Sequence, residues 1–236
     1  AVNLAAYLAS NKKKTLLIDM DPQGNATSGI GIDTNQIQYT LYDTLINRIK
    51  IGDVILPTLF DNLHCIPANK HLAGAEIELV NEVSRETFLR ETIKPINDYY
   101  EYIVIDCAPS LGLLTINALV AANKTIIPLQ CEYFALEGIA GLVNTLEAVK
   151  HSYNPKLEIT GIVLTMFDRR TSLNKQVVNN TKDFFRDLVF KTIVPRNIRL
   201  TEAPSHGVPI SIYQPSSSGA HAYSELTKEV INRVEA

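Results

Sequence analysis

The chain has 236 residues, of which 46% are hydrophobic, and this is enough apolar material for one sizeable core. Its net charge of −3 excludes a uniformly basic surface, so any contact with nucleic acid needs a local patch. The three cysteines are widely spaced and form no CxxC or Cys/His pattern, which indicates buried free thiols. No apolar run approaches the roughly 20 residues that span a bilayer, so no membrane-spanning helix is expected.

Strands and helices are expected to alternate along the whole chain. The expected strands are 15–18, 63–67, 102–106, 124–129, 157–167, 190–194 and 208–213. The expected helices are 2–9, 40–56, 71–98, 113–122, 135–151, 173–188 and 220–235, with breaks near Ser84 and before Pro95. Residues 25–31 are expected to form a small-residue loop. This alternation predicts one α/β domain over residues 1–236, a doubly wound, mostly parallel sheet with helices on both faces.

Two of the expected strands end in aspartate. The stretch TLLIDMDPQG at 15–24 has an apolar run before Asp19 and Asp21, and YIVID at 102–106 ends in Asp106. In open α/β sheets, ligands bind at the carboxyl ends of the parallel strands. These carboxylates are therefore expected to converge on one crevice, as in a magnesium–nucleotide site. The alternative is that each aspartate only caps the helix or turn that follows it.

Five motifs together resemble the ParA/Soj-type chromosome- and plasmid-partition ATPases, which belong to the P-loop ATPases with a deviant Walker A motif. The motifs cover nearly the whole chain: DMDPQGNATSG (19–29), YIVIDCAPSLGLLTINAL (102–119), PLQCEYFALEG (128–138), GIVLTMFDRRT (161–171) and VPRNIRLTEAPSHGVPI (194–210). The resemblance implies ATP and Mg²⁺ as cofactors. It also implies that Asp21 positions and activates the attacking water, that Asp106 holds Mg²⁺, and that Asp19 supports the phosphate-binding loop and the metal shell.

The resemblance further implies residues for adenine and for DNA. Pro195, Arg196 and Asn197 match the segment that contacts adenine, and Met166 lies where relatives place a residue that packs on the base. An apolar residue at a strand end is, alternatively, part of the core. Arg170 and Arg199 match basic positions used for DNA. The alternative for both is an ordinary surface charge or, for Arg199, an anchor for its own loop.

One family feature does not occur in this sequence. The KGGVGKTT phosphate-binding loop and the strand before it would lie immediately upstream of Ala1, and no G-x-x-x-x-G-K-[ST] pattern occurs in the 236 residues. The chain therefore resembles a family member truncated just after that loop. We expect the chain as printed to bind nucleotide weakly or not at all, because the loop supplies the N–H groups that cradle phosphates.

The resemblance implies an ATP-driven partition switch that is cytoplasmic and associated with the nucleoid. ATP would favour a homodimer that binds DNA without sequence preference, and a ParB-type partner would stimulate hydrolysis. An alternative is a MinD-type division-site ATPase, which requires a cationic amphipathic helix at the C-terminus. Residues 220–236 carry three glutamates against one lysine and one arginine, which disfavours membrane binding. A third alternative is a non-catalytic binding module.

Overall fold

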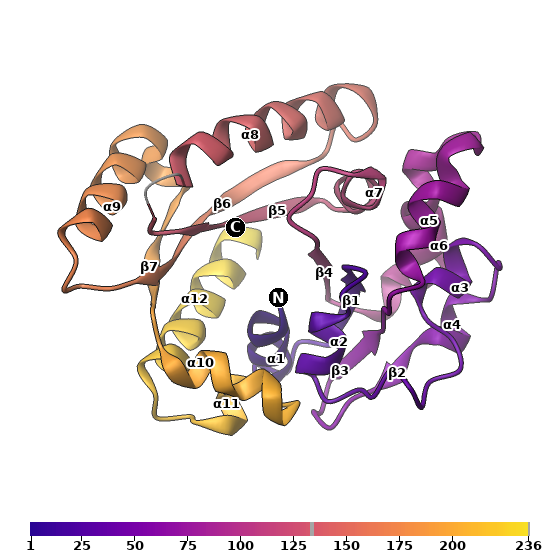
Figure 1. Ribbon diagram of the computed structural model, residues 1–236, viewed down its shortest axis with the longest axis horizontal. Coiled ribbons are helices and arrows are strands. Elements are labelled where there is room, and N and C mark those ends of the chain that lie inside the picture. Colours follow the sequence, from indigo (N-terminus) through magenta and orange to yellow (C-terminus); the bar gives the residue numbers. More distant parts are fainter. Residues whose placement is uncertain (133–134, 236) are drawn as a thin grey trace.

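The computed structural model describes residues 1–132 and 135–235, and it contains two sheets flanked by helices (Figure 1). The first sheet has the order β2–β3–β1–β4, and the second has the order β5–β6–β7. All strand pairs are parallel except β2 with β3. The strands are β1 (Thr15–Met20), β2 (Leu56–Pro57), β3 (Leu63–Ile66), β4 (Tyr102–Cys107), β5 (Lys124–Gln130), β6 (Glu158–Phe167) and β7 (Val189–Pro195).

Helices cover both faces of each sheet, which confirms the predicted fold class. Those near the first sheet are α1 (Val2–Ser10), α2 (Asn25–Gly29), α3 (Leu41–Leu45), α4 (Ile51–Val54), α5 (Leu72–Glu78), α6 (Phe88–Ile93) and α7 (Leu113–Ala121). Those near the second are α8 (Ala135–Ser152), α9 (Ser172–Phe185), α10 (Ile198–Glu202), α11 (Ile210–Tyr213) and α12 (Ser218–Glu235). Figure 1 shows α8 and α9 on one face of the second sheet and α12 on the other. Short 3₁₀ helices complete the connections: η1 (Leu79–Asn81), η2 (Arg85–Thr87), η3 (Lys94–Tyr99), η4 (Arg186–Leu188) and η5 (Ala203–His206).

Strand β1 is the most deeply buried strand of the first sheet, because it has a neighbour on each side and a layer on each face. Every residue of β1 is buried. Leu16, Ile18 and Met20 join the core under α3, α5 and α6, whereas Leu17 joins the core under α1 and α2. The alternation follows from the pleat, which sends successive side chains to opposite faces. A continuous apolar run is therefore what this position requires.

The described residues form two separate sheets where the sequence predicts one. Strand β4 pairs with β1, and β5 pairs with β6, but no ladder joins β4 to β5 within the described parts of the chain. All side chains of β4 are consequently half-buried, although its composition resembles that of β1. Residue composition identifies strands, but it does not specify which strand edges meet.

Three expected elements differ from the structure. Residues 25–31 were expected as a loop, yet Asn25–Gly29 forms the short helix α2. The expected helix 40–56 is divided into α3 and α4, because Arg48 between them adopts a left-handed backbone with φ of 57°. Residues 208–213 were expected as a strand, but Ile210–Tyr213 is one turn of helix. The expected break at Ser84, also left-handed, is confirmed.

The turn that replaces the strand at 208–213 has a physical reason. Pro209 is extended and precedes the first helical residue, where its missing N–H costs nothing. Ile210 is fully buried, and its backbone N–H donates to Oδ1 of Asn3 at 2.9 Å. Alternating apolar residues suggested a strand, but this long-range contact favours a helical turn.

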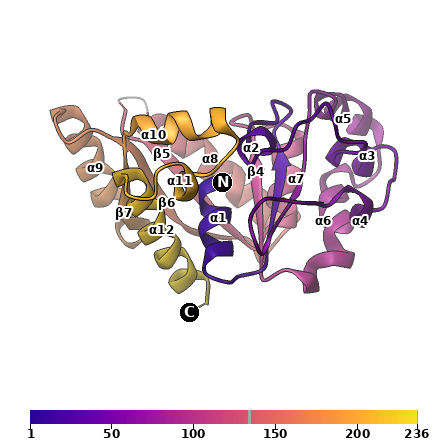
Figure 2. The same cartoon turned by 90° about the horizontal axis from the view of Figure 1, so that it is seen from below.

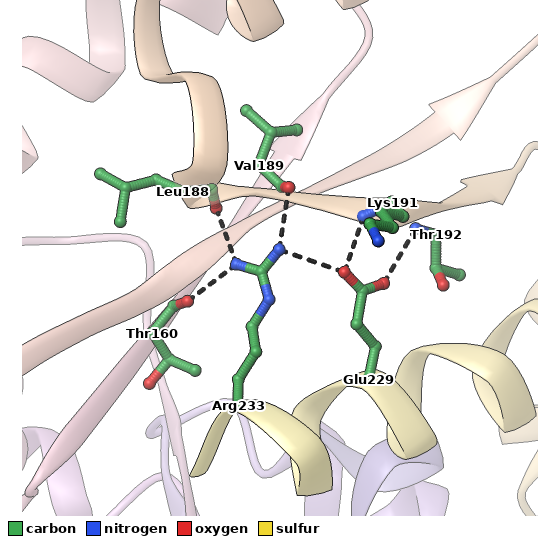
Figure 3. Close-up of polar contacts among 7 residues, drawn as sticks. All are labelled: Thr160, Leu188, Val189, Lys191, Thr192, Glu229 and Arg233. Atoms are coloured by element: carbon green, nitrogen blue, oxygen red, sulfur yellow. Dashed lines mark hydrogen bonds and ion pairs between the residues drawn. The ribbon is translucent and has the colours of Figure 1, made fainter. Parts of the chain in front are cut away.

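Helix α12 is fixed to the second sheet by a half-buried arginine, Arg233 (Figure 3). The guanidinium of Arg233 donates to the carbonyl of Thr160 at 3.0 Å, of Leu188 at 3.3 Å and of Val189 at 3.0 Å. The β6–β7 register is irregular between Ile162 and Leu164, so the strand ladder is interrupted near these carbonyls. Arg233 supplies the donors that the interrupted ladder does not.

The same helix provides acceptors for β7. The carboxylate of Glu229 accepts hydrogen bonds from the backbone N–H of Lys191 at 2.8 Å and of Thr192 at 3.0 Å. It also pairs with Arg233 at 3.1 Å, and both side chains are less than a quarter exposed. We call Glu229 and Arg233 the α12 clamp, because they satisfy β7 backbone groups at an edge that no other strand covers within the described residues. No helix of the described residues has the length and apolarity needed to cross a bilayer.

Replacing Arg233 by Met should lower the free energy of unfolding by about 2–3 kcal/mol, because three carbonyls and a carboxylate lose a charged donor. Urea titration followed by circular dichroism measures this loss. Lys228→Met on the same helix is the matched control, since its pair with Glu225 is well exposed and should contribute less than about 1 kcal/mol. Equal losses in the two variants would show that the α12 clamp does not stabilise the fold.

Candidate functional site

The carboxyl ends of β1 and β4 lie side by side and bring the predicted carboxylates together. The strands pair in parallel with Asp19 opposite Asp106, so the two side chains leave the same face of the sheet. Burial is the main cause that raises the pKa of Asp19, and the charge of the nearby Asp106 adds to it. Asp19 and Asp106 therefore lie at one edge of the sheet, whereas a crevice shared with Asp21 and the chemical roles of the three carboxylates remain predictions.

Asp19 is fully buried and carries three hydrogen bonds from its own surroundings. Its Oδ2 accepts from the backbone N–H of Thr27 at 2.8 Å and from the Thr27 hydroxyl at 2.7 Å. Its Oδ1 accepts from the backbone N–H of Asp21 at 3.1 Å. Burial nevertheless raises the pKa of Asp19, because desolvation of the carboxylate outweighs these donors. One oxygen of Asp19 thus accepts from the turn after β1, and the other accepts from helix α2.

Asp21 lies in a tight turn with one oxygen already engaged. Its Oδ1 accepts from the backbone N–H of Gln23 at 2.9 Å, and its carbonyl accepts from Gly24 at 2.9 Å. Gly24 closes the turn with φ of 65°, and a Cβ there would lie 2.9 Å from the carbonyl oxygen of Ala68. Asp21 is half-buried, and its Oδ2 receives no hydrogen bond from the described residues. The turn therefore presents one carboxylate oxygen of Asp21.

Asp106 is half-buried at the end of β4, and its carboxylate accepts no hydrogen bond from the residues that the structure describes. The pKa of the adjacent Cys107 thiol is raised to about 12. Burial is the largest cause, and the negative charges of Asp106, Asp19 and Asp21 add to it. No group of three or more His, Cys, Asp or Glu in the described part of the chain is arranged to hold a metal by itself. A site with so few carboxylates fits Mg²⁺, which takes one or two carboxylates together with phosphate oxygens and water.

A second group of predicted residues lies at the carboxyl ends of β6 and β7. Phe167 is opposite Pro195, and the backbone N–H of Arg196 donates to the Phe167 carbonyl at 2.9 Å. Met166 is 39% exposed and has a left-handed backbone with φ of 55°. Such a conformation is uncommon for a residue with a side chain and occurs preferentially at functional sites. Exposure of Met166 argues against the alternative that it is only a core residue.

Asn197 has a structural task in the described geometry. Its Oδ1 accepts from the backbone N–H of Arg199 at 2.8 Å and caps α10, and its amide donates to the Ser218 hydroxyl at 2.7 Å. This arrangement links the end of β7 to the first residue of α12. The predicted contact between Asn197 and adenine remains a prediction, and it would need a group other than this committed carboxamide oxygen.

The two arginines predicted for DNA are exposed, and each already has a carboxylate partner. Arg170 is 85% exposed and forms a forked pair with Asp168, the closest distance being 2.7 Å. Arg170 holds the pKa of Asp168 well below its usual range. Arg199 pairs with Glu202 at 2.7 Å, so its expected alternative as a loop anchor has a structural basis. Binding of phosphate by either arginine would require exchange of these partners.

Several residues of the site were not identified from the sequence. Thr27 contacts Asp19 and also accepts from the backbone N–H of Ala68 at 2.9 Å, across 41 positions of sequence. Asp168 accepts a hydrogen bond from the guanidinium of Arg170 at 2.7 Å. The Tyr213 hydroxyl donates to Glu202 at 3.0 Å. Only the pair at Asp168 had a local signal, because an Asp two residues before an Arg in a turn favours such a contact. Tyr133 and Phe134, within one of the motifs, lie outside the described residues.

The first helix contributes to the same edge of the first sheet. Helix α1 packs its alanines against Leu17 of β1 and returns to β1 through residues 11–14, so the two run antiparallel. The N-terminus of α1 therefore lies at the edge where β1 ends (Figure 2). Unpaired N–H groups at a helix N-terminus favour anions.

Comparisons with known proteins found a matching family model, curated relatives and solved structures. A family model for the AAA domain matches residues 1–159. The sporulation initiation inhibitor protein Soj of Bacillus subtilis is 52% identical over 230 residues, which cover 98% of this chain and 91% of that protein. The chromosome-partitioning ATPase Soj of Treponema pallidum is 49% identical and covers 99% and 91%. Cobyrinic acid a,c-diamide synthase of Mycobacterium smegmatis, with bound ADP and magnesium, superposes with a TM-score of 0.85 at 30% identity, covering 99% and 88%.

Cys107 offers a chemical test of the carboxylate cluster. Replacing Asp106 by Asn removes a neighbouring negative charge, so the pKa of Cys107 should fall. Its thiolate fraction at pH 8 should rise about tenfold for each unit of pKa, and its alkylation should accelerate by a smaller factor, because a less basic thiolate is a weaker nucleophile. Peptide mass spectrometry after iodoacetamide treatment measures the rate. Cys131 is the internal control, because burial alone raises its pKa to about 11. An unchanged rate at Cys107 would contradict the proximity of these carboxylates.

Proposed function

Because the chain belongs to the ParA/Soj family of chromosome-partitioning ATPases, we propose that it acts as an ATP-driven switch in DNA segregation. In this proposal residues 1–236 serve as one ATPase domain whose nucleotide state controls self-association and DNA binding. A ParB-type partner stimulates hydrolysis and thereby releases the protein from DNA. The protein acts in the cytoplasm, on the nucleoid.

The observation that carries the proposal is the register of β1 and β4. It places Asp19 opposite Asp106 and sets Asp21 in the turn that follows β1. The N-terminus of α1 lies at the same edge. An anion-favouring helix end beside carboxylates that suit a hard cation is the pair of features that a magnesium–phosphate ligand requires.

The proposed chemistry divides the two aspartates by task. Mg²⁺ supplied with ATP would neutralise the charge that develops on the phosphates. Asp106 would hold that ion, directly or through water, because its carboxylate is not engaged by the described residues. Asp21 would use its available Oδ2 to orient the attacking water and accept its proton. Most of the rate in phosphoryl transfer comes from such positioning and charge stabilisation.

DNA binding in this proposal rests on Arg170 and Arg199 at the carboxyl edge of the second sheet. The chain has a net charge of −3, so one copy would hold phosphates weakly. Two copies joined by ATP would double the number of contacts, and binding would then fall steeply with salt. The MinD-type alternative needs a helix free to meet a membrane, and α12 itself is held to β7 by the α12 clamp.

The test of catalysis needs a phosphate-binding loop. We define the loop-bearing chimera as this chain with a KGGVGKTT loop and its preceding strand placed ahead of Ala1. In it, Asp21→Asn should retain ATP binding and lose about 100-fold or more in turnover, because only the water loses its orienting group. Asp106→Asn should weaken magnesium-dependent ATP binding and turnover together. Phosphate release and equilibrium binding of a fluorescent ATP analogue measure the two effects.

The printed 236-residue chain serves as the control for catalysis and should show no magnesium-dependent turnover. Asp61→Asn, at the turn between β2 and β3, is the matched carboxylate control and should behave like the unsubstituted chimera. Unchanged turnover in Asp21→Asn would remove Asp21 from the catalytic role.

DNA binding by the chimera with ATP should weaken in Arg170→Ala and in Arg199→Ala, with the salt slope shallower by about one in each. Filter binding of unrelated duplexes against salt concentration measures both quantities. Asp168→Asn should tighten binding, because it releases Arg170 from its partner.

Lys228→Ala is the matched cation control for this experiment, since Lys228 lies on α12 and pairs there with Glu225. Its affinity and salt slope should equal those of the unsubstituted chimera. Full affinity and an unchanged salt slope in both arginine variants would contradict the assignment of Arg170 and Arg199 to DNA binding.

A further inference from the structure

We propose that Thr27 and Asp19 form a buried brace whose task in the reaction is to position Asp21. This inference rests on the proposed function, because it assigns the brace to the turn that carries the water-orienting carboxylate. In this assignment neither Thr27 nor Asp19 touches nucleotide or water. They act through the backbone of Asp21, and the brace is defined as Asp19, Thr27 and the Ala68 N–H.

The brace is complete within the protein. Asp19 and Thr27 are both 0% exposed. Three donors converge on the Asp19 carboxylate, two from Thr27 and one from the Asp21 backbone, and both carboxylate oxygens are used. A charged group without solvent is stabilised only by such donors, so loss of one of them is felt by the others. The arrangement leaves Asp19 no oxygen that is free of an internal partner.

Thr27, in helix α2, connects Asp19 near the end of β1 to the segment after β3. Its hydroxyl donates to Asp19 at 2.7 Å and accepts from the Ala68 N–H at 2.9 Å, so one oxygen links strand β1 to the segment after β3. A second contact reinforces the link, because Gly24 packs against the Ala68 carbonyl so closely that a Cβ would come within 2.9 Å. Asp21 lies between Asp19 and Gly24 in sequence and is thereby held on both sides.

The position of Asp21 follows from this network. Its backbone N–H is fixed by Asp19, its carbonyl by Gly24, and its Oδ1 by the N–H of Gln23. The remaining oxygen, Oδ2, then has a direction set by hydrogen bonds within the protein. A displacement of about 1 Å at a reacting group can cost about 100-fold in rate. A brace of this kind affects the catalytic step more than the binding of ATP.

The test compares hydroxyl deletion with hydroxyl retention in the loop-bearing chimera. Thr27→Val keeps the shape of the side chain and removes the link, so kcat should fall about 10- to 100-fold while KM for ATP stays within about twofold. Thr27→Ser keeps the hydroxyl and should restore kcat to within about threefold. Thr44→Val is the matched control, because the buried Thr44 hydroxyl has no partner among the described residues and its removal should leave kcat unchanged.

A double-mutant cycle separates positioning from general damage to the fold. In an Asp21→Asn background, Thr27→Val should cause no further loss of single-turnover hydrolysis, because the brace acts through Asp21. An equal loss in both backgrounds, a wild-type kcat in Thr27→Val, or a rise in KM that matches the fall in kcat would overturn the positioning role. Full hydrolysis in the Asp21→Asn protein alone would instead contradict the proposed function.

Amide hydrogen exchange keeps the inference testable if Thr27→Val hydrolyses nothing. In that variant the amides of Asp21 and Ala68 should exchange faster than in the Thr27→Ser protein, while the amides of Leu16 and Leu17 in β1 keep their protection. Unchanged exchange at Asp21 would show that the brace does not hold the turn.

Discussion

The parallel pairing of β1 with β4 determines where the carboxylates of this protein lie. Strand β1 is covered on both faces and paired on both sides, so its register with β4 is fixed by burial rather than by its polar residues. A shift of one residue would turn Leu17 and Asp19 to the opposite face of the sheet. Because the apolar residues cannot make that shift without exposure, Asp19 stays opposite Asp106, and Asp21 stays in the turn beyond it.

The sequence was informative where a local pattern had one solution. Strand β1 and strand β4 follow from their apolar runs, and the acidic ends of these strands follow from the way parallel strands collect ligands at one edge. Helix α11 was missed because alternating isoleucines suit both a strand and a helical turn, and a contact with Asn3 decides between them. The split of the sheets was also missed, since strand pairing depends on edges that composition does not describe.

The site residues divide in the same way. Asp21 and Asp106 were found from strand ends and from the family motifs, and the structure gives each an available carboxylate. Thr27 was not identified, because its structural role depends on a hydrogen bond from the distant Ala68 N–H, and no local sequence pattern predicts that bond. Asp168 shows a further limit, since motif matching identifies the cation Arg170 but not the carboxylate that pairs with it. The pairing of Arg199 with Glu202 corresponds to the loop-anchor alternative that the sequence offered.

The central claim is that the carboxyl ends of β1 and β4 form one magnesium–nucleotide site. Paramagnetic broadening tests it most directly, with Mn²⁺ in place of Mg²⁺ and ATP bound to the loop-bearing chimera. The account predicts that the amide signals of Asp21, Asp106 and Cys107 broaden on addition of Mn²⁺ and ATP, while those of α9 remain sharp. Sharp signals at Asp21 and Asp106 in the ATP-bound protein would contradict it.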